Sequence, residues 1–427
     1  MSVPTDHFRI RGATLLDAAG SRVEDLGIAD GRIVPVDELD VQAIEIDATD
    51  CLVSTGLVDL KAHLGEPGDE AAETMASGGE AAVLGGYTTV LAMPDTHPPV
   101  DTAAVVEHIR MLGASALCGV EVAGTVTVGA AGERLAPLAE LAQAGVRFVT
   151  DCGAGVQDPL LLRRALEYAK PLGLTIAQAA DCVPLSRGTH MHEGEWSSRL
   201  GLAGAPAEAE EINVMRDISL VRLTGGRLHF QTLSAAGSFA IVSAAAQSGL
   251  PISSSVTTHH LRLCDADLAG YDTCLKVTPP LRAAGDARAA MSAVAAGRVD
   301  VIVSDHRPHT TDRKERPFDH AATGSVGLET SLAAALCSGI DHSTVLRAMS
   351  WRPAQLVGLG DPETRSLRPG APADIVIIDP TETWTVSTAS MATLGTNSAF
   401  EGTELTGRVR STFVGGRLVV DQGKVAA

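Results

Sequence analysis

The pattern of hydrophobic and polar residues changes twice along the chain. About the first fifty residues form short apolar runs separated by turn residues, for example FRIRGATLLD and AIEIDA. Ala-Asp-Gly at 29–31 is typical of a hairpin turn. The C-terminal segment is similar, most clearly in ADIVIIDP and VRSTFVGGRLVV. Because neither end has enough apolar residues for its own core, we predict one small composite β-sandwich domain from residues 1–52 and 367–427.

Between these segments, strand-like runs alternate with amphipathic helical runs, clearest at 158–173 and 207–226. Repeated strand-then-helix units over residues 53–366 predict an α/β fold, a TIM (β/α)8 barrel. A doubly wound open sheet is the alternative, but no glycine-rich phosphate-binding motif follows the first strand. The predicted strands are 53–64, 87–95, 121–129, 146–153, 174–181, 227–234, 252–259 and 299–306.

Composition excludes several classes of partner. The 427 residues carry a net charge of −19, which disfavours binding to nucleic acid or anionic lipid. No apolar run approaches the roughly 18–20 residues of a membrane span, and the first residues lack the pattern of a secretory signal. The seven cysteines are scattered without CxxC spacing. We therefore expect a reduced, cytoplasmic protein.

A TIM barrel has its active site at the C-terminal ends of its strands, so those ends carry the candidate chemistry. Acidic and histidine residues gather there in short runs, and other motifs lie in the loops between. These runs are Glu-Pro-Gly at 66–68, Met-Pro-Asp-Thr at 93–96, His-Glu-Gly at 192–194, Thr-His-His-Leu at 258–261, Pro-Pro-Leu-Arg at 279–282, Asp-His-Arg-Pro-His-Thr at 305–310 and Gly-Leu-Glu-Thr at 327–330.

In their order and spacing, these motifs resemble the dihydroorotases, within the cyclic amidohydrolase group of the amidohydrolase superfamily, almost from end to end. The resemblance implies one or two zinc ions held by a His-x-His pair, an acid or modified lysine, two further histidines and an aspartate. Three of these ligands remain here: His63, Asp151 and Asp305. The other three positions hold Lys61, Gln178 and Thr232, and an amide or hydroxyl is a poor zinc ligand.

The resemblance also implies residues that bind the substrate, and most of these are changed. The family's arginine and asparagine for the substrate carboxylate are replaced by Gly65 and Asp95, and a further asparagine is replaced by Thr278. A glycine supplies no cation, and an aspartate adds negative charge where an anion must dock. His309, another substrate-contact position, is kept. The metal and substrate positions are therefore degraded by separate substitutions.

We accordingly predict a non-catalytic member without a cofactor, in which Asp305 is a vestige of the catalytic proton shuttle. We expect the Lys61 ammonium to replace the metal as the counter-cation of Asp151 and Asp305. The resemblance implies a structural partnership with aspartate carbamoyltransferase in pyrimidine biosynthesis, in a homo-oligomer or hetero-complex. The alternative is an active enzyme with one zinc ion on His63, Asp151 and Asp305, acting on dihydroorotate or a hydantoin.

Several other histidine, cysteine and acidic residues could suggest a functional site, but we interpret them as structural. The loop pair His190 and His192 is not expected to bind metal, and we expect the pair His259–His260 to pack beneath the barrel mouth. Cys152 and Cys182 are interpreted as small buried side chains rather than ligands. The acidic stretch AEAEEINVMRD at 207–217 is interpreted as the solvated start of a helix.

Overall fold

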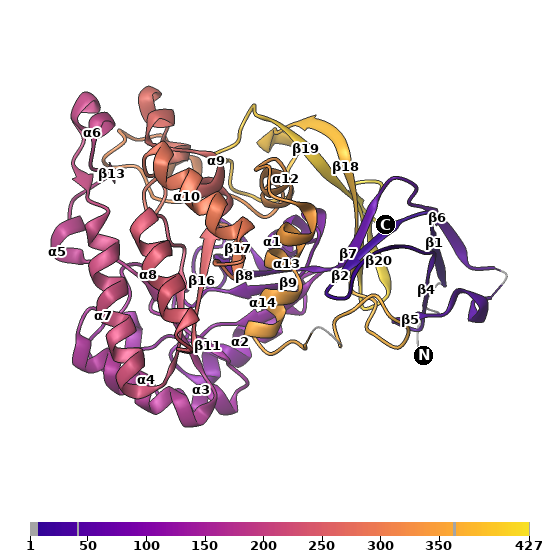
Figure 1. The fold of residues 1–427 in the computed structure, drawn as a ribbon, viewed down its shortest axis with the longest axis horizontal. Coiled ribbons are helices and arrows are strands. Elements are labelled where there is room, and N and C mark those ends of the chain that lie inside the picture. The colour runs from indigo at the N-terminus through magenta and orange to yellow at the C-terminus, as the bar shows by residue number, and fades with distance from the viewer. Residues whose placement is uncertain (1–6, 41, 362–363, 427) are drawn as a thin grey trace.

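The computed structural model describes residues 7–40, 42–361 and 364–426. Two sheets built from the chain ends lie at one end of the molecule, and a larger body of parallel strands and helices forms the rest (Figure 1). The strands of the terminal sheets are β1 (Phe8–Arg11), β2 (Thr14–Asp17), β3 (Gly20–Val23), β4 (Leu26–Ala29), β5 (Arg32–Val34), β6 (Ile44–Asp47), β7 (Leu52–Thr55), β18 (Ile375–Thr385), β19 (Glu404–Val414), β20 (Arg417–Asp421) and β21 (Lys424–Val425).

The terminal strands mix the two ends of the chain. The larger sheet has the order β21-β20-β19-β18-β7-β2-β3, and the smaller has the order β5-β4-β1-β6. Buried apolar residues of both sheets, among them Ile10, Ile28, Ile377 and Phe413, form one cluster. The predicted boundary between residues 52 and 53 remains a prediction, and β7 continues across it within the larger sheet.

The central strands are parallel and lie in two sheets, with the orders β10-β9-β8 and β11-β12-β15-β16-β17. They are β8 (Leu57–Ala62), β9 (Tyr87–Ala92), β10 (Gly119–Val122), β11 (Phe148–Val149), β12 (Thr175–Ala179), β15 (Arg227–Gln231), β16 (Ile252–Thr257) and β17 (Val301–Val303). Isolated parallel bridges join the two sheets on both sides, Gly124 to Val149 and Ala62 to His306. Seven of the eight predicted central strands contain an observed one, whereas β10 begins two residues before the predicted strand 121–129. All eight observed strands end earlier than predicted, because the last predicted residues belong to loops.

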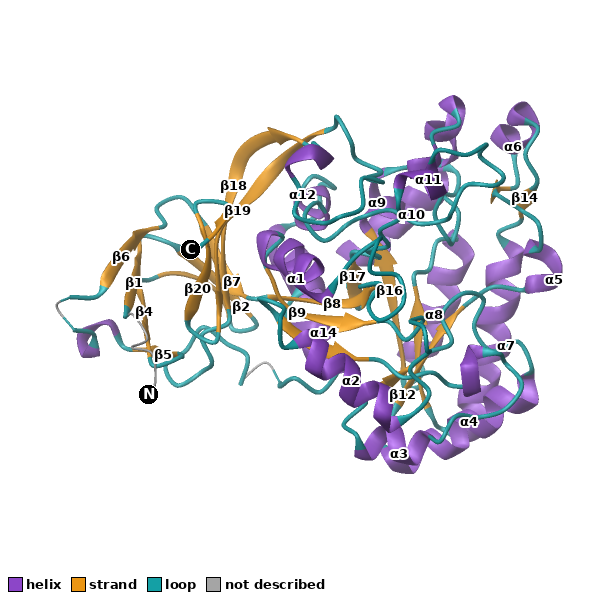
Figure 2. Cartoon of the chain, turned by 180° about the vertical axis from the view of Figure 1, so that it is seen from behind, coloured by secondary structure: helices purple, strands orange, loops and turns teal. Residues whose placement is uncertain are grey.

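Helices cover these sheets (Figure 2). They are α1 (Met75–Leu84), α2 (Ala103–Gly113), α3 (Leu138–Gln143), α4 (Pro159–Leu172), α5 (Val183–Ser186), α6 (Glu195–Leu200), α7 (Glu208–Thr224), α8 (Ala236–Gln247), α9 (Thr258–Arg262), α10 (Ala284–Ala295), α11 (Thr311–Lys314), α12 (Ser331–Leu336), α13 (His342–Met349) and α14 (Trp351–Leu356). The short parallel strands β13 (Met191–His192) and β14 (Gly204–Ala205) pair in a loop.

The ends of α4 show why local sequence predicted it well. The Asp158 side chain accepts a hydrogen bond from the Leu160 backbone N–H, and Pro159 stands in the first turn. The helix ends at Gly173, whose φ of 70° lies in the left-handed region. Helix α7 ends in the same way at Gly225. These capping signals account for the close agreement with the predicted ranges 158–173 and 207–226.

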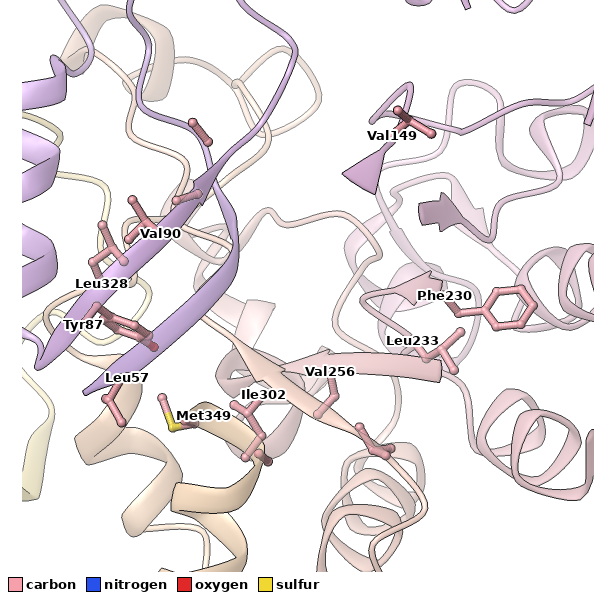
Figure 3. Packing of buried hydrophobic residues seen from close by; sticks show 14 of the residues in the cluster. Leu57, Tyr87, Val90, Val149, Phe230, Leu233, Val256, Ile302, Leu328 and Met349 are labelled. Carbon is pink, nitrogen blue, oxygen red and sulfur yellow. The ribbon is translucent and has the colours of Figure 1, made fainter. Parts of the chain in front are cut away.

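Successive side chains of the central strands point to opposite faces of the sheets, and each face belongs to a different buried cluster. Val58, Leu91, Phe148 and Val301 belong to a cluster shared by the central strands, whereas Leu57 and Val90 belong to the large cluster that includes helix residues. Figure 3 shows part of the large cluster, with Leu57, Tyr87 and Val90 on one side and Phe230 and Val256 on the other. Among the described residues, no helix combines the length and hydrophobicity needed to cross a membrane.

Candidate functional site

The candidate site lies at the C-terminal ends of the parallel strands. Lys61 is near the end of β8, and His63 follows it. Asp305 follows β17, and Thr232 follows β15. Asp305 and Thr232 have positive φ values of 49° and 51°, a conformation uncommon outside glycine that is found at functional sites. The fold therefore brings together residues that are far apart in sequence, at the position where parallel α/β folds place their sites.

The central contact of the site is an ion pair. Lys61 Nζ lies 2.9 Å from Asp305 Oδ1, and the two side chains are only 12% and 10% exposed. Lys61 Nζ also donates a hydrogen bond of 3.3 Å to Thr232 Oγ1. Burial opposes ionisation of Asp305, but Lys61 together with the nearby His63 and His259 outweighs it, so the pKa of Asp305 is lowered. The prediction that Lys61 is the counter-cation of Asp305 is confirmed.

Asp151 does not share in this ion pair, so the prediction that Lys61 also neutralises it is wrong. Asp151 Oδ1 accepts hydrogen bonds from the backbone N–H groups of Val126 and Thr127, at 2.8 and 2.9 Å. Its Oδ2 accepts from Thr127 Oγ1 at 2.5 Å. Burial raises the pKa of Asp151, against these hydrogen bonds. Asp151 thus holds the loop after β10, because that loop presents enough donors to satisfy its carboxylate.

Gln178 is likewise committed to the backbone. Its side chain makes two hydrogen bonds with Val156, accepting from the N–H at 3.1 Å and donating to the C=O at 2.9 Å. Gln178 is 1% exposed, and Val156 is fully buried. The amide therefore satisfies the Val156 N–H, which would otherwise be buried without a partner, and it shares the Val156 C=O with Arg216 Nη2, which donates at 2.9 Å. A histidine ring at this position would lose at least one of these two bonds.

His63 belongs to a second network. Its Nδ1 lies 2.7 Å from Asp95 Oδ1, and Arg307 Nη2 donates to Asp95 Oδ2 at 3.1 Å. Burial lowers the pKa of His63, although Asp95 opposes this effect. Burial also disfavours the Asp95 carboxylate, but His63 and Arg307 together lower the pKa of Asp95. His63 Nε2 is buried and has no hydrogen-bond partner.

These donors do not fit the family's zinc site. Of its six ligand positions, Lys61 is an ammonium paired with Asp305, Gln178 is bonded to backbone, and Asp151 is held by the 126–127 loop. In the part of the chain that the structure describes, no group of three or more His, Cys, Asp or Glu side chains is placed to hold a metal ion. The three predicted residual ligands, His63, Asp151 and Asp305, are therefore not assembled as one set.

The substrate-side positions are also altered in structure. Gly65 has a φ of 68°, and a Cβ there would lie 2.6 Å from the Glu73 carbonyl oxygen, so the local fold leaves no room for a side chain. His309 Nε2 lies 3.0 Å from the Thr323 carbonyl oxygen, to which it donates. Burial lowers the pKa of His309 to about 4. The retained histidine is thus neutral and bonded to the loop that carries Thr323.

A cavity of about 150 Å³ lies beside the ion pair, large enough for a small molecule. Thr278 lines it, as the sequence predicts for a substrate position. Sequence reasoning gave no role to three charged groups, Asp181, Lys276 and Arg282, that also line it. Lys276 and Arg282 already donate hydrogen bonds to backbone carbonyl oxygens, so they have a structural role in the lining of the cavity. In the His63 network, sequence analysis missed Arg307, which pairs with Asp95. The only sign of a functional role for Arg307 in the sequence was its position within the run Asp-His-Arg-Pro-His at 305–309.

The pair His259–His260 and Cys152 are buried as predicted, whereas Cys182 is only half-buried. That His190 and His192 bind no metal stays a prediction. His260 bonds to Thr257 Oγ1 at 2.7 Å and to the Pro279 carbonyl at 3.1 Å, and His259 stacks on Phe400. Burial lowers the pKa of both His259 and His260 to about 4. His192 lies 3.4 Å from an Arg282 nitrogen, a cationic neighbour that disfavours a metal ion. Burial raises the pKa of the Cys152 thiol.

Comparisons with known proteins agree with the motifs. The family described as "Dihydro-orotase-like" matches residues 51–238. A protein named Dihydroorotase from Anaeromyxobacter dehalogenans (strain 2CP-C) is 41% identical, over 98% of this chain and 99% of that protein. One from Mycobacterium tuberculosis (strain ATCC 25618 / H37Rv) is 41% identical over 96% and 97%.

Solved structures give the same fold. The L-hydantoinase (dihydropyrimidinase) from Arthrobacter aurescens matches with a TM-score of 0.87 and 22% identity, covering 99% of this chain and 98% of that one. The D-hydantoinase (dihydropyrimidinase) from Thermus sp. matches with a TM-score of 0.84 and 22% identity, covering 98% and 96%. At this identity the likeness establishes the cyclic amidohydrolase fold alone.

Proposed function

This chain belongs to the dihydroorotase-like family, and we propose that it is a member whose mouth is neutralised by protein charges instead of a metal ion. It would then serve pyrimidine biosynthesis without hydrolysing the dihydroorotate ring. The observation that carries the proposal is the 2.9 Å ion pair between Lys61 and Asp305. The Lys61 ammonium contacts that carboxylate. It therefore occupies the space of a zinc ion and supplies the positive charge that a zinc ion would otherwise supply.

We infer that the central sheets form one closed (β/α)8 barrel and that the terminal sheets form a composite β-sandwich. The parallel bridges at Gly124–Val149 and Ala62–His306 support closure, since they join the outer strands of the two central sheets on both sides. The shared apolar cluster supports the sandwich. A closed barrel makes the mouth rigid, so a charged side chain buried there cannot move into solvent. It must be paired with an opposite charge or hydrogen-bonded within the protein.

The charge balance of the mouth supports a metal-free state. Lys61 compensates Asp305, and Arg307 compensates Asp95, so these two buried or half-buried carboxylates each have a protein cation. Asp151 has three hydrogen-bond donors of its own. A divalent cation placed among them would meet the Lys61 ammonium at close range, and the repulsion would have to be removed by deprotonating or displacing that lysine.

An active cyclic amidohydrolase with one zinc ion is the second candidate, and the comparisons favour it. Relatives at 41% identity over nearly the whole chain are named Dihydroorotase. In the site, His63 Nε2 is buried without a partner, which is the state expected of a nitrogen that awaits a ligand. For this candidate Lys61 must swing away from Asp305, and Asp151 must leave the 126–127 loop.

Zinc content and turnover together distinguish the candidates. We expect the purified chain, incubated with zinc and then desalted, to retain less than about 0.1 zinc per chain and to hydrolyse neither dihydroorotate nor hydantoin. Stoichiometric zinc with turnover that a chelator abolishes would overturn the proposal. If the chain hydrolyses a hydantoin but not dihydroorotate, the second candidate is favoured, with a hydantoin as its substrate.

A repair experiment tests which residues cause the loss. The triple variant Lys61→His, Gln178→His and Thr232→His is expected to bind zinc, because it restores the three lost imidazoles and frees Asp305. It is expected to regain little dihydroorotate turnover, since Gly65 and Asp95 are unchanged. Adding Gly65→Arg is not a clean repair, because a Cβ there would clash with the Glu73 carbonyl. Full activity of the triple variant would contradict the substrate-side part of the proposal.

We propose aspartate carbamoyltransferase as the partner of this non-catalytic chain, on the strength of the family resemblance. Mixing the purified chain with the carbamoyltransferase of the same organism should give one complex in size-exclusion chromatography with light scattering. Two separate peaks at concentrations of about 10 µM would contradict a partnership of micromolar affinity. Carbamoyltransferase activity that falls when this chain is absent from the cell would support it.

A further inference from the structure

A second cavity, of about 320 Å³, lies where C-terminal strands of the chain pack against the larger body. Its walls come from the end of α1, from the start of α12, and from β18 and β19. Figures 1 and 2 both show α1 and α12 beside the β18–β19 pair. The cavity shares no lining residue with the one beside the Lys61–Asp305 ion pair. What it binds is therefore independent of whether the mouth holds a metal ion.

The Glu329 carboxylate, in the motif Gly-Leu-Glu-Thr at 327–330, lines this cavity. Glu329 Oε1 accepts hydrogen bonds from the backbone N–H groups of Ala392 and Thr393, at 3.0 and 3.3 Å. In the described part of the chain, no hydrogen bond or ion pair reaches Glu329 Oε2, and this oxygen retains accessible surface. One oxygen thus holds the side chain in place, and the other is available to a ligand.

The charges around Glu329 favour a cationic ligand. Burial, together with the nearby carboxylates of Glu73 and Glu80, raises the pKa of Glu329 to about 7, against its two backbone hydrogen bonds. Arg408 also lines the cavity, but its guanidinium is already paired with Glu382 at 3.1 Å. A half-buried carboxylate among like charges is stabilised when a cation binds to it.

The rest of the lining mixes apolar and polar groups. Leu332 and Val409 contribute buried apolar side chains from α12 and β19. Trp384 of β18 is held in place, because its indole N–H donates a hydrogen bond to the Gly407 carbonyl oxygen at 3.1 Å. Thr385 adds a hydroxyl group. A volume of about 320 Å³ lies at the lower end of the range for ligand pockets, so the cavity suits a small molecule.

A divalent metal ion does not fit this cavity. Glu329 offers one oxygen, whereas magnesium and calcium ions take six or more oxygen ligands. Among the residues that the structure describes, no group of three or more His, Cys, Asp or Glu side chains could hold a metal ion. An organic ammonium group needs only one carboxylate, as the contact of Lys61 with Asp305 shows within this chain.

We propose that this cavity binds a small primary amine in its ammonium form. The ammonium donates a hydrogen bond to Glu329 Oε2 and supplies the positive charge that the lining does not offer to this carboxylate. The carbon chain of the amine lies against Leu332, Val409 and the Trp384 ring. The proposal goes beyond the role of the mouth, since the two cavities are lined by different residues.

NMR spectroscopy of the full chain, labelled with ¹⁵N-tryptophan, tests the cavity. Trp384 lines it, whereas Trp196 and Trp351 do not, and the variant Trp384→Phe assigns the signal. Butylamine hydrochloride, titrated at about pH 8 so that Glu329 is ionised, should move the Trp384 indole signal with a dissociation constant of about 5 mM or tighter. The other two indole signals should stay in place.

Neutral and inorganic probes separate amine binding from weaker effects. Butan-1-ol lacks the charge and sodium chloride lacks the carbon chain, so neither should move the Trp384 signal at the same concentration. No movement with butylamine up to about 50 mM would overturn the proposal, as would equal movement with either control. Nα-acetyl-lysine methylamide imitates a lysine of another protein, and tighter binding of this probe than of butylamine would also overturn a site for a free amine.

The variant Glu329→Gln tests the carboxylate itself. A glutamine keeps an oxygen for the backbone N–H groups of Ala392 and Thr393, so the variant should fold with unchanged circular dichroism. Its dissociation constant for butylamine should rise at least about 10-fold, because the negative charge is gone. The matched control Glu80→Gln removes a nearby charge that does not line the cavity, and it should change that constant by less than about 3-fold. Unchanged binding in Glu329→Gln, or an equal loss in both variants, would overturn the proposal.

Discussion

The two sides of the mouth compensate their buried polar groups in different ways. On the β8 and β17 side, the Asp305 carboxylate is neutralised by the Lys61 ammonium. On the β11 and β12 side, Asp151 and Gln178 are satisfied by backbone groups of the neighbouring loops. The difference follows from what each position offers, because a carboxylate without nearby backbone donors needs a cation, whereas one beside a loop with free N–H groups does not.

The largest expected effect comes from removing the ammonium. Lys61→Met leaves Asp305 buried without a counter-charge and should lower the free energy of unfolding by about 3–5 kcal/mol at pH 7. Urea denaturation followed by circular dichroism measures this change. The double variant Lys61→Met with Asp305→Asn removes both charges and should lie within about 1 kcal/mol of the native chain. A single variant as stable as the native chain would show that water, not Lys61, solvates Asp305.

The second effect is a loss of stability in mild acid that comes from histidines and not from the ion pair. Burial lowers the pKa of His229, His259 and His260 to about 4, whereas an unfolded histidine titrates near 6.5. The unfolded chain therefore binds protons first, so this stability is complete above pH 6.5 and is lost as the pH falls toward 4. The lowered pKa of Asp305 acts in a separate window, since its contribution is lost only below about pH 3.9.

We expect each of these histidines to lower the free energy of unfolding by about 2 kcal/mol between pH 7 and pH 5. Denaturation curves at a series of pH values measure the slope. The variant His259→Phe keeps a ring against Phe400 and should remove about 2 kcal/mol of this pH dependence, because one of the titrating groups is gone. A slope that begins only below pH 4 would assign acid lability to the carboxylates instead.

A smaller effect is expected on the side that is bonded to backbone. Gln178→Ala leaves the N–H of Val156 buried without a partner, while the Val156 C=O keeps its hydrogen bond from Arg216, and should cost about 1–3 kcal/mol of unfolding free energy. The matched control Gln143→Ala, at an exposed position of α3, should change stability by less than about 0.5 kcal/mol. If both variants behave alike, the amide of Gln178 does not hold its loop.

The smallest effect is expected at the rim. Arg307 and Asp95 are 36% and 29% exposed, so Arg307→Ala should cost less than about 1 kcal/mol. It should nevertheless raise the pKa of His63, because the guanidinium is one of the charges that lowers it. An NMR titration of the His63 ring measures that shift. A fall in the pKa of His63 would mean that Arg307 acts on His63 mainly through its grip on Asp95.

Much of the fold could be predicted because its signals are local. The capping residues and the apolar period gave α4 almost to the residue. The strand ends were predicted too far downstream, since the positive φ values of Asp305 and Thr232, which lie just beyond the strands, leave no signal in the hydrophobic pattern. The acidic stretch 207–217 begins a helix as predicted, but the prediction that it is solvated is wrong for Glu210. Glu210 is 2% exposed, because its carboxylate accepts a hydrogen bond from the Ser234 backbone N–H.

By itself, the sequence determined the family and the order of strands and helices, and it places Lys61, Gln178 and Thr232 where the family resemblance implies histidines. It also predicted that Lys61 would face Asp305, because both charges lie at the C-terminal ends of the parallel strands. Only the tertiary structure decided that Asp151 turns to the 126–127 loop, that Arg307 covers Asp95, and that Gly65 has no room for a side chain. Those outcomes depend on which groups lie within hydrogen-bonding distance of each side chain. The packing of residues that are distant in sequence determines those distances.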